Sequence, residues 1–148
     1  MSFKTWHDYG FGFCASDIVT TPEKILALAA LKPEVYESVR LYLNDCFEGE
    51  KYDDADLGDD IFDEYEGVNY GTGLSAILFE VIDEFSVYHS TDFDGNQYLL
   101  YTAKYPWSMP ENELGLTKEH VTEVFTKYIR MLTDVEVPIG YQSIANGG

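Results

Sequence analysis

Two hydrophobic periodicities divide the chain. Aromatic and small residues alternate over YGFGFC at 9–14, and this period of two predicts a β-strand. Three later segments, 33–47, 74–85 and 117–132, instead repeat apolar residues every three or four positions. That spacing places the apolar side chains on one face of a helix, so each segment is predicted to be an amphipathic α-helix.

Local signals place a shorter helix before the first of these. The sequence TTPE at 20–23 predicts a helix start, because threonine is a good N-cap and proline suits the first helical turn. Thr20 and Glu23 have the spacing of a capping box. The helix is predicted to end at Lys32, because a residue before proline disfavours helical geometry, and Pro33 begins the next helix.

Two further runs, 86–91 and 97–105, are rich in tyrosine, valine, leucine and threonine, which favours strands. An Asp-Gly pair at 94–95 lies between them and predicts a β-hairpin, since glycine accepts positive φ angles.

Residues 135–144 are predicted to form the last strand. Pro138 has no N–H for a ladder, so it favours an edge strand or a strand start. The end of the chain, 146–148, is predicted to be flexible. The element order is therefore β-α-α-(acidic element)-α-β-β-α-β. It predicts one α+β domain over 1–148, with about four helices and a mainly antiparallel sheet of about four strands.

The acidic element spans 48–66 and is the strongest compositional feature of the chain. It contains ten carboxylates and one cation, Lys51. The ten are Glu48, Glu50, Asp53, Asp54, Asp56, Asp59, Asp60, Asp63, Glu64 and Glu66. Apolar residues at Leu57, Ile61, Phe62 and Tyr65 interrupt the charges, and the last three have the spacing of a short helical turn. We therefore expect an exposed element that is anchored to the fold and is not a linker.

The charge of the whole chain limits its partners. The formal net charge is -18, from 27 acidic and 9 basic residues. This argues against direct binding to nucleic acid, whose affinity comes mainly from lysine and arginine, and against binding to an anionic membrane. It favours a basic protein partner, cations, or solubility alone. An aromatic content of 16% argues against disorder of the whole chain.

The compartment is predicted to be cytoplasmic. The N-terminal sequence MSFKTWHDYG has no apolar stretch typical of a signal peptide. No apolar run approaches the roughly 18 residues that span a bilayer. Cys14 and Cys46 both have apolar neighbours, so we predict two reduced, buried thiols.

No motif for catalysis, a cofactor or a metal reaches comparable strength. Asp92, Asp94 and Asn96 alternate like calcium ligands, but an EF-hand needs glutamate at its twelfth position, where this chain has Ala103. The hairpin interpretation is therefore favoured over a calcium loop. The three histidines are scattered, and neither cysteine belongs to a CxxC pair. We predict no catalytic residue, no cofactor and no metal.

Three segments carry a resemblance. YGFGFCASDI at 9–18, DFDGNQYLLYTAKYPW at 92–107 and SIANGG at 143–148 resemble small acidic proteins of phages and mobile elements in low-GC Gram-positive bacteria. That group has no assigned activity, so no functional residue carries over. The resemblance implies an accessory protein of a mobile element, a context that includes inhibitors of host defence.

The first functional hypothesis is a non-enzymatic binding module. Its ten carboxylates at 48–66 would engage the basic surface of a partner, such as a nucleic-acid-handling enzyme, as a DNA mimic or anti-defence protein does. A solvated charged face with no partner competes closely with this interpretation.

Two alternatives stay open. One is a small-molecule binder or enzyme with its site near the N-terminal aromatic strand, around Trp6, His7, Tyr9, Tyr101 and Trp107. The other is a structural homo-oligomer, since the sequence leaves the oligomeric state open.

Overall fold

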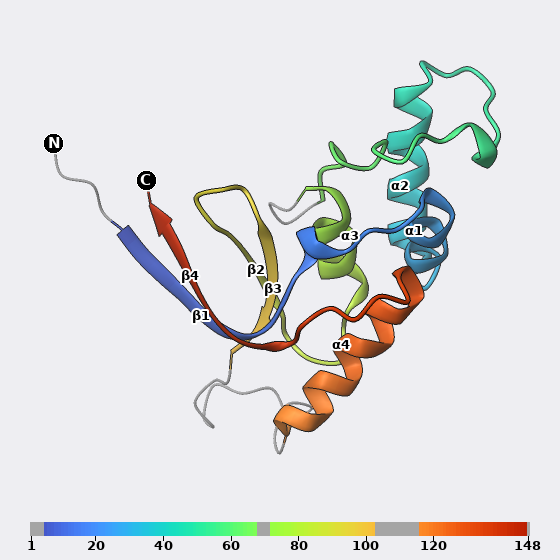
Figure 1. The fold of residues 1–148 in the computed structure, drawn as a ribbon. Helices are drawn as coiled ribbons and strands as arrows, with labels where there is room; N and C mark the ends of the chain where they lie inside the picture. The colour runs from blue at the N-terminus through green and yellow to red at the C-terminus, as the bar shows by residue number, and fades with distance from the viewer. Residues whose placement is uncertain (1–4, 68–71, 103–115, 148) are drawn as a thin grey trace, which may run out of the picture.

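The computed structural model describes residues 5–67, 72–102 and 116–147. They form an antiparallel four-stranded sheet in the order β2-β3-β1-β4, together with α-helices (Figure 1). The strands are β1 (Thr5–Cys14), β2 (Tyr88–Thr91), β3 (Gln97–Tyr101) and β4 (Gly140–Gly147). The helices are α1 (Pro22–Ala29), α2 (Pro33–Cys46), α3 (Gly73–Val81) and α4 (Lys118–Leu132). This confirms the predicted α+β class and, in outline, the predicted element order.

The N-terminal strand β1 is central and pairs with both β3 and β4. Gly12 lies opposite Leu100 on β3 and opposite Gly140 on β4. A Cβ atom at Gly12 would lie 1.9 Å from the carbonyl oxygen of Leu99. The alternation of aromatic residues and glycines thus serves two purposes: Phe11 and Phe13 are buried in the core whereas Tyr9 is exposed, and Gly12 permits the close approach of β3.

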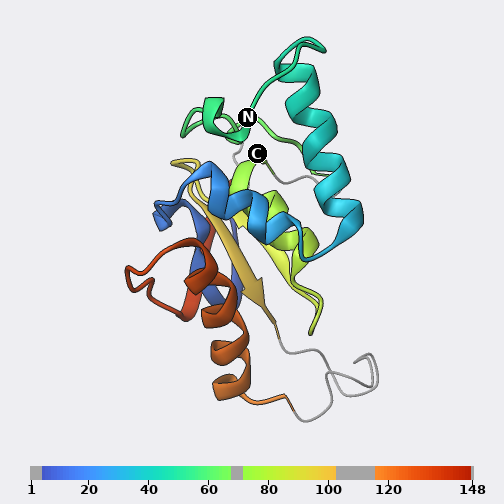
Figure 2. The same ribbon diagram turned by 90° about the vertical axis from the view of Figure 1, so that its right-hand side faces the viewer.

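The helices lie on one side of the sheet, as Figure 2 shows for α1, α3 and α4. Phe13 on β1 meets Phe125 on α4 edge to face, with ring centroids 5.1 Å apart. Phe85, just after α3, meets the same Phe125 ring at 5.4 Å. Ile77 and Leu78 on α3 are completely buried. The main core therefore lies between the sheet and this helical layer.

Three helix boundaries differ from the prediction, the first of which is the end of α1 at Ala29 rather than at Lys32. The N-cap of α1 is Thr21, whose hydroxyl accepts a hydrogen bond from the backbone N–H of Lys24 at 3.4 Å. The Thr20–Glu23 capping box is therefore wrong, and the Thr20 hydroxyl is buried with no hydrogen-bond partner among the described residues. The third helix stops at Val81, and Phe85 is buried outside it.

The last strand begins later and ends later than predicted. After α4, residues 133–139 form an irregular crossing, and β4 starts only at Gly140. Pro138 lies before this strand, and β4 is an edge strand of the described sheet, in agreement with the prediction. The backbones of Asn146 and Gly147 pair with β1, so the predicted flexible end begins too early in the chain.

The β2–β3 hairpin confirms the turn prediction. The Asp92 carboxylate accepts hydrogen bonds from the backbone N–H groups of Asp94 and Asn96, both at 2.9 Å. Gly95 has a φ of 85°. The alternating acids thus belong to an Asx-type turn. The strand ends at Tyr101, and 103–105 lie outside the described residues.

The thiol prediction holds for one cysteine. Both cysteines are free, but Cys14 is buried whereas Cys46 is exposed at the end of α2. The apolar face of α2 is formed by Val35, Val39 and Leu43, and Cys46 lies beyond it. In the part of the chain that the structure describes, no helix is both long and apolar enough to cross a bilayer.

Candidate acidic surface

The acidic segment, residues 48–66, leaves the end of α2, forms a 3-10 turn at Asp54–Asp56 and returns toward α3 (Figure 1). Two positive φ angles reverse the chain after the helix, 55° at Glu48 and 80° at Gly49. The Gly49 N–H donates to the carbonyl of Asn44 at 3.0 Å. This satisfies one of the free carbonyls at the helix end, as a glycine cap commonly does.

Arg40 on α2 fastens the first half of the acidic segment. Its guanidinium donates two hydrogen bonds to the Asp54 carboxylate, at 2.8 and 3.1 Å. It also donates to the hydroxyls of Tyr36 at 3.0 Å and Tyr52 at 3.3 Å. The hydrogen bonds from Arg40 lower the pKa of Asp54, and those to Asp54 and Tyr52 raise the pKa of Arg40. A bidentate contact of this kind sets both position and orientation.

The second half is anchored by buried side chains. Phe62 and Tyr65 are only 2% and 1% exposed, and the Tyr65 ring packs edge to face against Tyr42 on α2. The Tyr65 hydroxyl lies 3.0 Å from the Ser38 hydroxyl, and the Tyr42 hydroxyl donates to the carbonyl of Ile61. These contacts confirm that the apolar residues pin the segment down, although they lie on successive turns rather than on one helical turn.

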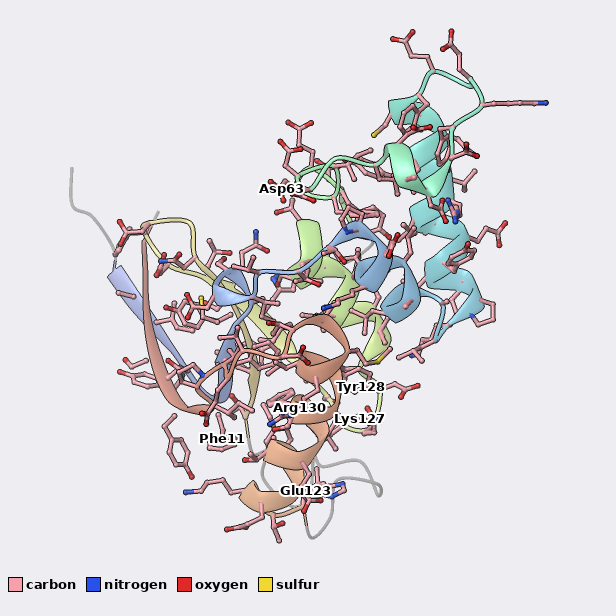
Figure 3. The ribbon with its side chains drawn as sticks, turned by 45° about the vertical axis from the view of Figure 1, so that its right-hand side comes forward. Phe11, Asp63, Glu123, Lys127, Tyr128 and Arg130 are labelled. Atoms are coloured by element: carbon pink, nitrogen blue, oxygen red, sulfur yellow. The ribbon has the colours of Figure 1, made fainter. Side chains whose placement is uncertain are left out.

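All ten predicted carboxylate residues are exposed. Among the ion pairs of the described residues, Asp54 is the one member of the ten that takes part. Figure 3 shows carboxylates along the whole segment, with Asp63 close to the start of α3 and others around the outer end of α2. Asp54 therefore positions the acidic segment, and the other nine carry charge that no described cation neutralises.

A shallow depression of about 690 Å³ lies within this surface, between the end of α2 and the loop around Tyr52. Glu50, Asp53 and Asp56 contribute to its lining, as does Lys51. The Asp53 N–H donates to the Asp56 carboxylate at 3.0 Å. Within the described ranges, no group of three or more His, Cys, Asp or Glu side chains converges in a way that would hold a metal ion.

The alternative site near the N-terminal strand coincides with an aromatic groove of about 440 Å³ between β1, β4 and the start of α4. Tyr9 and Tyr101, both predicted, line it together with Phe11, Tyr141 and Lys118. The Lys118 ammonium lies 5.4 Å from the centre of the Tyr141 ring and 5.9 Å from that of Phe11. The structure therefore brings two of the five predicted residues together.

The structure does not place the side chains of the other three predicted residues. Trp6 and His7 belong to β1, opposite β4, but only their backbone is described, and Trp107 lies outside the described residues. The sequence reasoning missed Lys118 and Tyr141. The pairing of Phe11 with Tyr141 across β1 and β4 is the signal that would have found them, and it depends on knowing the strand order.

Comparison with known proteins does not add a family. No protein-family model matches the chain, and no curated protein or solved structure matches it significantly.

Proposed function

We propose that this protein is a non-enzymatic binding module that uses the acidic segment to engage a basic surface on a partner protein. The observation that carries the proposal is the exposed array of carboxylates on a folded scaffold. Arg40, Phe62 and Tyr65 hold the backbone that presents these charges. A segment that is ordered before binding loses less conformational entropy on association than a disordered acidic tail does.

The partner we propose is a nucleic-acid-handling enzyme. Such an enzyme has a basic groove suited to phosphates, which occur at roughly one charge per 1.7 Å along duplex DNA. A net charge of -18 would accelerate encounter with that groove through long-range attraction. The resemblance to small acidic proteins of phages and mobile elements supports an anti-defence role of this kind.

The proposal is tested by affinity capture from a low-GC Gram-positive bacterial lysate at low and high salt. The decisive variant replaces Asp53, Asp59, Asp60 and Asp63 with asparagine and keeps Asp54, because Asp54 is the structural partner of Arg40. We expect the parent protein to capture a basic nucleic-acid enzyme that salt or duplex DNA releases. The variant should lose this capture while its melting temperature stays close to that of the parent.

A charge-matched control separates a local surface from net charge. It neutralises four exposed acids outside the acidic segment, Glu23, Glu37, Glu119 and Asp134. Both variants change the net charge by the same amount, so only a local surface makes them differ. Equal losses in the two variants would refute a site at 48–66, and so would undiminished capture by the asparagine variant.

A second candidate function is the binding of a small planar ligand in the aromatic groove. The groove is mostly apolar, and Lys118 is the charged group that lines it. These properties fit an aromatic anion such as anilinonaphthalene sulfonate, used here as a probe. Its fluorescence enhancement should fall in Tyr141→Ser and Lys118→Gln. An enhancement that both substitutions leave unchanged would count against this second function.

A further inference from the structure

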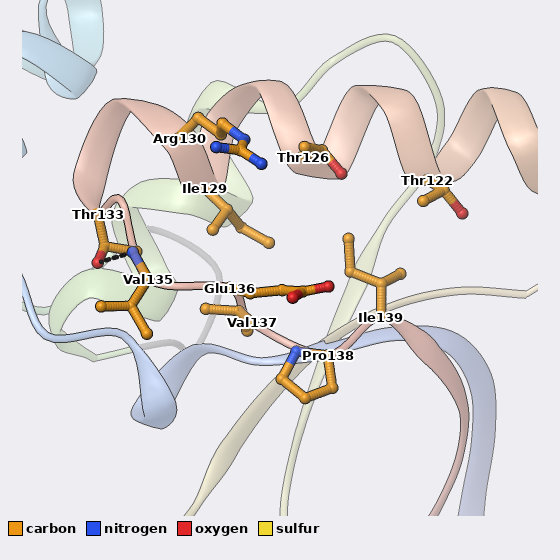
Figure 4. A pocket seen from close by; sticks show the side chains of 10 residues that line it. All are labelled: Thr122, Thr126, Ile129, Arg130, Thr133, Val135, Glu136, Val137, Pro138 and Ile139. Atoms are coloured by element: carbon orange, nitrogen blue, oxygen red, sulfur yellow. Dashed lines mark hydrogen bonds between the residues drawn. The ribbon is translucent and has the colours of Figure 1, made fainter.

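A second cleft lies between α4 and the irregular crossing at 133–139, with a volume of about 400 Å³ (Figure 4). Ile129 on the helix and Ile139 at the end of the crossing contribute its apolar walls. The side chains of Arg130 and Glu136 project into the same space from opposite sides. A cleft of this size suits a small ligand, since ligand pockets span about 300–1,000 Å³.

The two charges in the cleft are not neutralised by any side chain in the described part of the chain. Neither Arg130 nor Glu136 forms an ion pair with the other or with any other residue that the structure describes. Nearby on α4, by contrast, Lys127 lies 2.6 Å from the carboxylate of Glu84. Among the described residues, the cleft thus presents one cation and one anion that have no ion-pair partner.

The Thr126 hydroxyl also belongs to the cleft. Thr126 lines the cleft one helical turn before Arg130, so both side chains lie on one face of α4 (Figure 4). The neighbouring hydroxyls are occupied: Thr122 donates to the carbonyl of Lys118 at 2.8 Å, and Thr133 accepts from the N–H of Val135 at 3.1 Å. The Thr126 hydroxyl has no hydrogen bond to another described residue.

We propose that this cleft binds a small zwitterion of the amino-acid class with a branched aliphatic side chain. Arg130 and Thr126 donate hydrogen bonds to its carboxylate, and the Glu136 carboxylate accepts hydrogen bonds from its ammonium group. The aliphatic part of the ligand lies against Ile129 and Ile139. Charge-assisted hydrogen bonds at both ends fix the orientation of the ligand. A ligand without net charge also avoids the long-range repulsion that a protein of charge -18 exerts on simple anions.

This site is independent of the acidic segment and is tested on the full chain by NMR, with L-leucine as the probe. Leucine should shift the amide resonances of Thr126, Arg130 and Glu136 in a saturable way. Two control probes keep its branched aliphatic chain but carry only one charge each: 4-methylpentanoate lacks the ammonium group, and isopentylamine lacks the carboxylate. Each should bind at least about tenfold more weakly, because one charged contact is lost.

Variants complete the test. Arg130→Gln and Glu136→Gln should each weaken leucine binding by about tenfold or more. Lys24→Gln removes an exposed cation on α1 and should leave it unchanged. The proposal is overturned if millimolar leucine does not shift the cleft resonances, if Arg130→Gln binds leucine as the parent does, or if 4-methylpentanoate binds as tightly as leucine.

Discussion

The two ends of the helical layer are held in different ways. Where α4 meets β1, completely buried rings of Phe13 and Phe125 interlock. Where the acidic segment meets α2, the contacts combine the buried ring of Tyr65 with the exposed clamp between Arg40 and Asp54. The first region gains stability from apolar burial, which salt hardly weakens, and the second gains part of it from hydrogen bonds and charge.

This difference explains how the fold tolerates its charge. The carboxylates of the acidic segment are exposed to solvent, where their mutual repulsion is screened over roughly 8–10 Å at physiological salt. The apolar core includes Leu57, Phe62 and Tyr65 of this segment but none of its carboxylates. The exposed carboxylates can therefore carry a function in binding while the buried apolar side chains carry the stability.

The largest expected effect is in the core. Phe125→Ala removes a completely buried ring that contacts both Phe13 and Phe85. It should lower the free energy of unfolding by about 3–5 kcal/mol, measured by urea denaturation. A loss below about 1 kcal/mol would mean that this ring cluster is not the centre of stability.

A glycine pair tests the packing of the sheet. Gly12→Ala places a Cβ atom 1.9 Å from the Leu99 carbonyl oxygen, so it should cost about 3 kcal/mol in unfolding free energy. Its partner across β1 and β4 is the control: a Cβ atom at Gly140 meets no atom within 4 Å. Gly140→Ala should change urea stability little, and equal losses at the two positions would contradict the close approach at Gly12.

A smaller and local effect is expected at the clamp. Arg40→Lys keeps the charge but loses the bidentate contact with Asp54, because lysine is a point charge. Hydrogen exchange should accelerate over 50–56, while the free energy of global unfolding falls by only about 1 kcal/mol. Exchange that accelerates equally in α4 would show that the clamp supports the whole fold rather than the acidic segment.

The smallest expected effect is the pH dependence of the stability that the ion pair between Glu84 and Lys127 contributes. Burial alone would raise the pKa of Glu84, but hydrogen bonds from Lys127 and Tyr128 outweigh it and lower the pKa below the usual 4.5. Because the pKa of Glu84 is lower in the folded state than in the unfolded state, the ionised Glu84 carboxylate stabilises the fold fully above pH 4.5. This stabilisation is lost as the pH falls through the pKa that Glu84 has in the folded state. The melting temperatures of the parent and Glu84→Gln should therefore converge in acid. A gap that persists or widens there would contradict the assigned contacts.

Much of the fold follows from local signals in the sequence. The 3.6-residue spacing and the flanking Pro33 and Thr117 placed α2 and α4 almost to the residue. The Asp-Gly pair placed the β2–β3 hairpin correctly. The buried positions of Phe62 and Tyr65 also followed from their place among charged neighbours. For the helices and the hairpin the deciding interactions lie within a few residues along the chain, whereas the side chain of Tyr65 contacts Tyr42 and Ser38 on α2.

What the sequence did not predict depends either on a choice between equivalent neighbouring residues or on distant contacts. Thr21, not Thr20, caps α1, a choice between adjacent residues of one type. The β4 strand starts at Gly140, opposite Gly12, although β1 continues to Cys14 in its pairing with β3. The clamp between Arg40 and Asp54 joins residues 14 positions apart, and no spacing rule indicates it.

The central claim is that the acidic segment itself contacts a basic partner. Hydrogen exchange of the protein with and without the captured enzyme tests this most directly. Exchange across 48–66 should slow in the complex and return to the free rate at high salt, while exchange in α4 stays unchanged. Protection confined to α4 or to the sheet, with 48–66 unaffected, would contradict it.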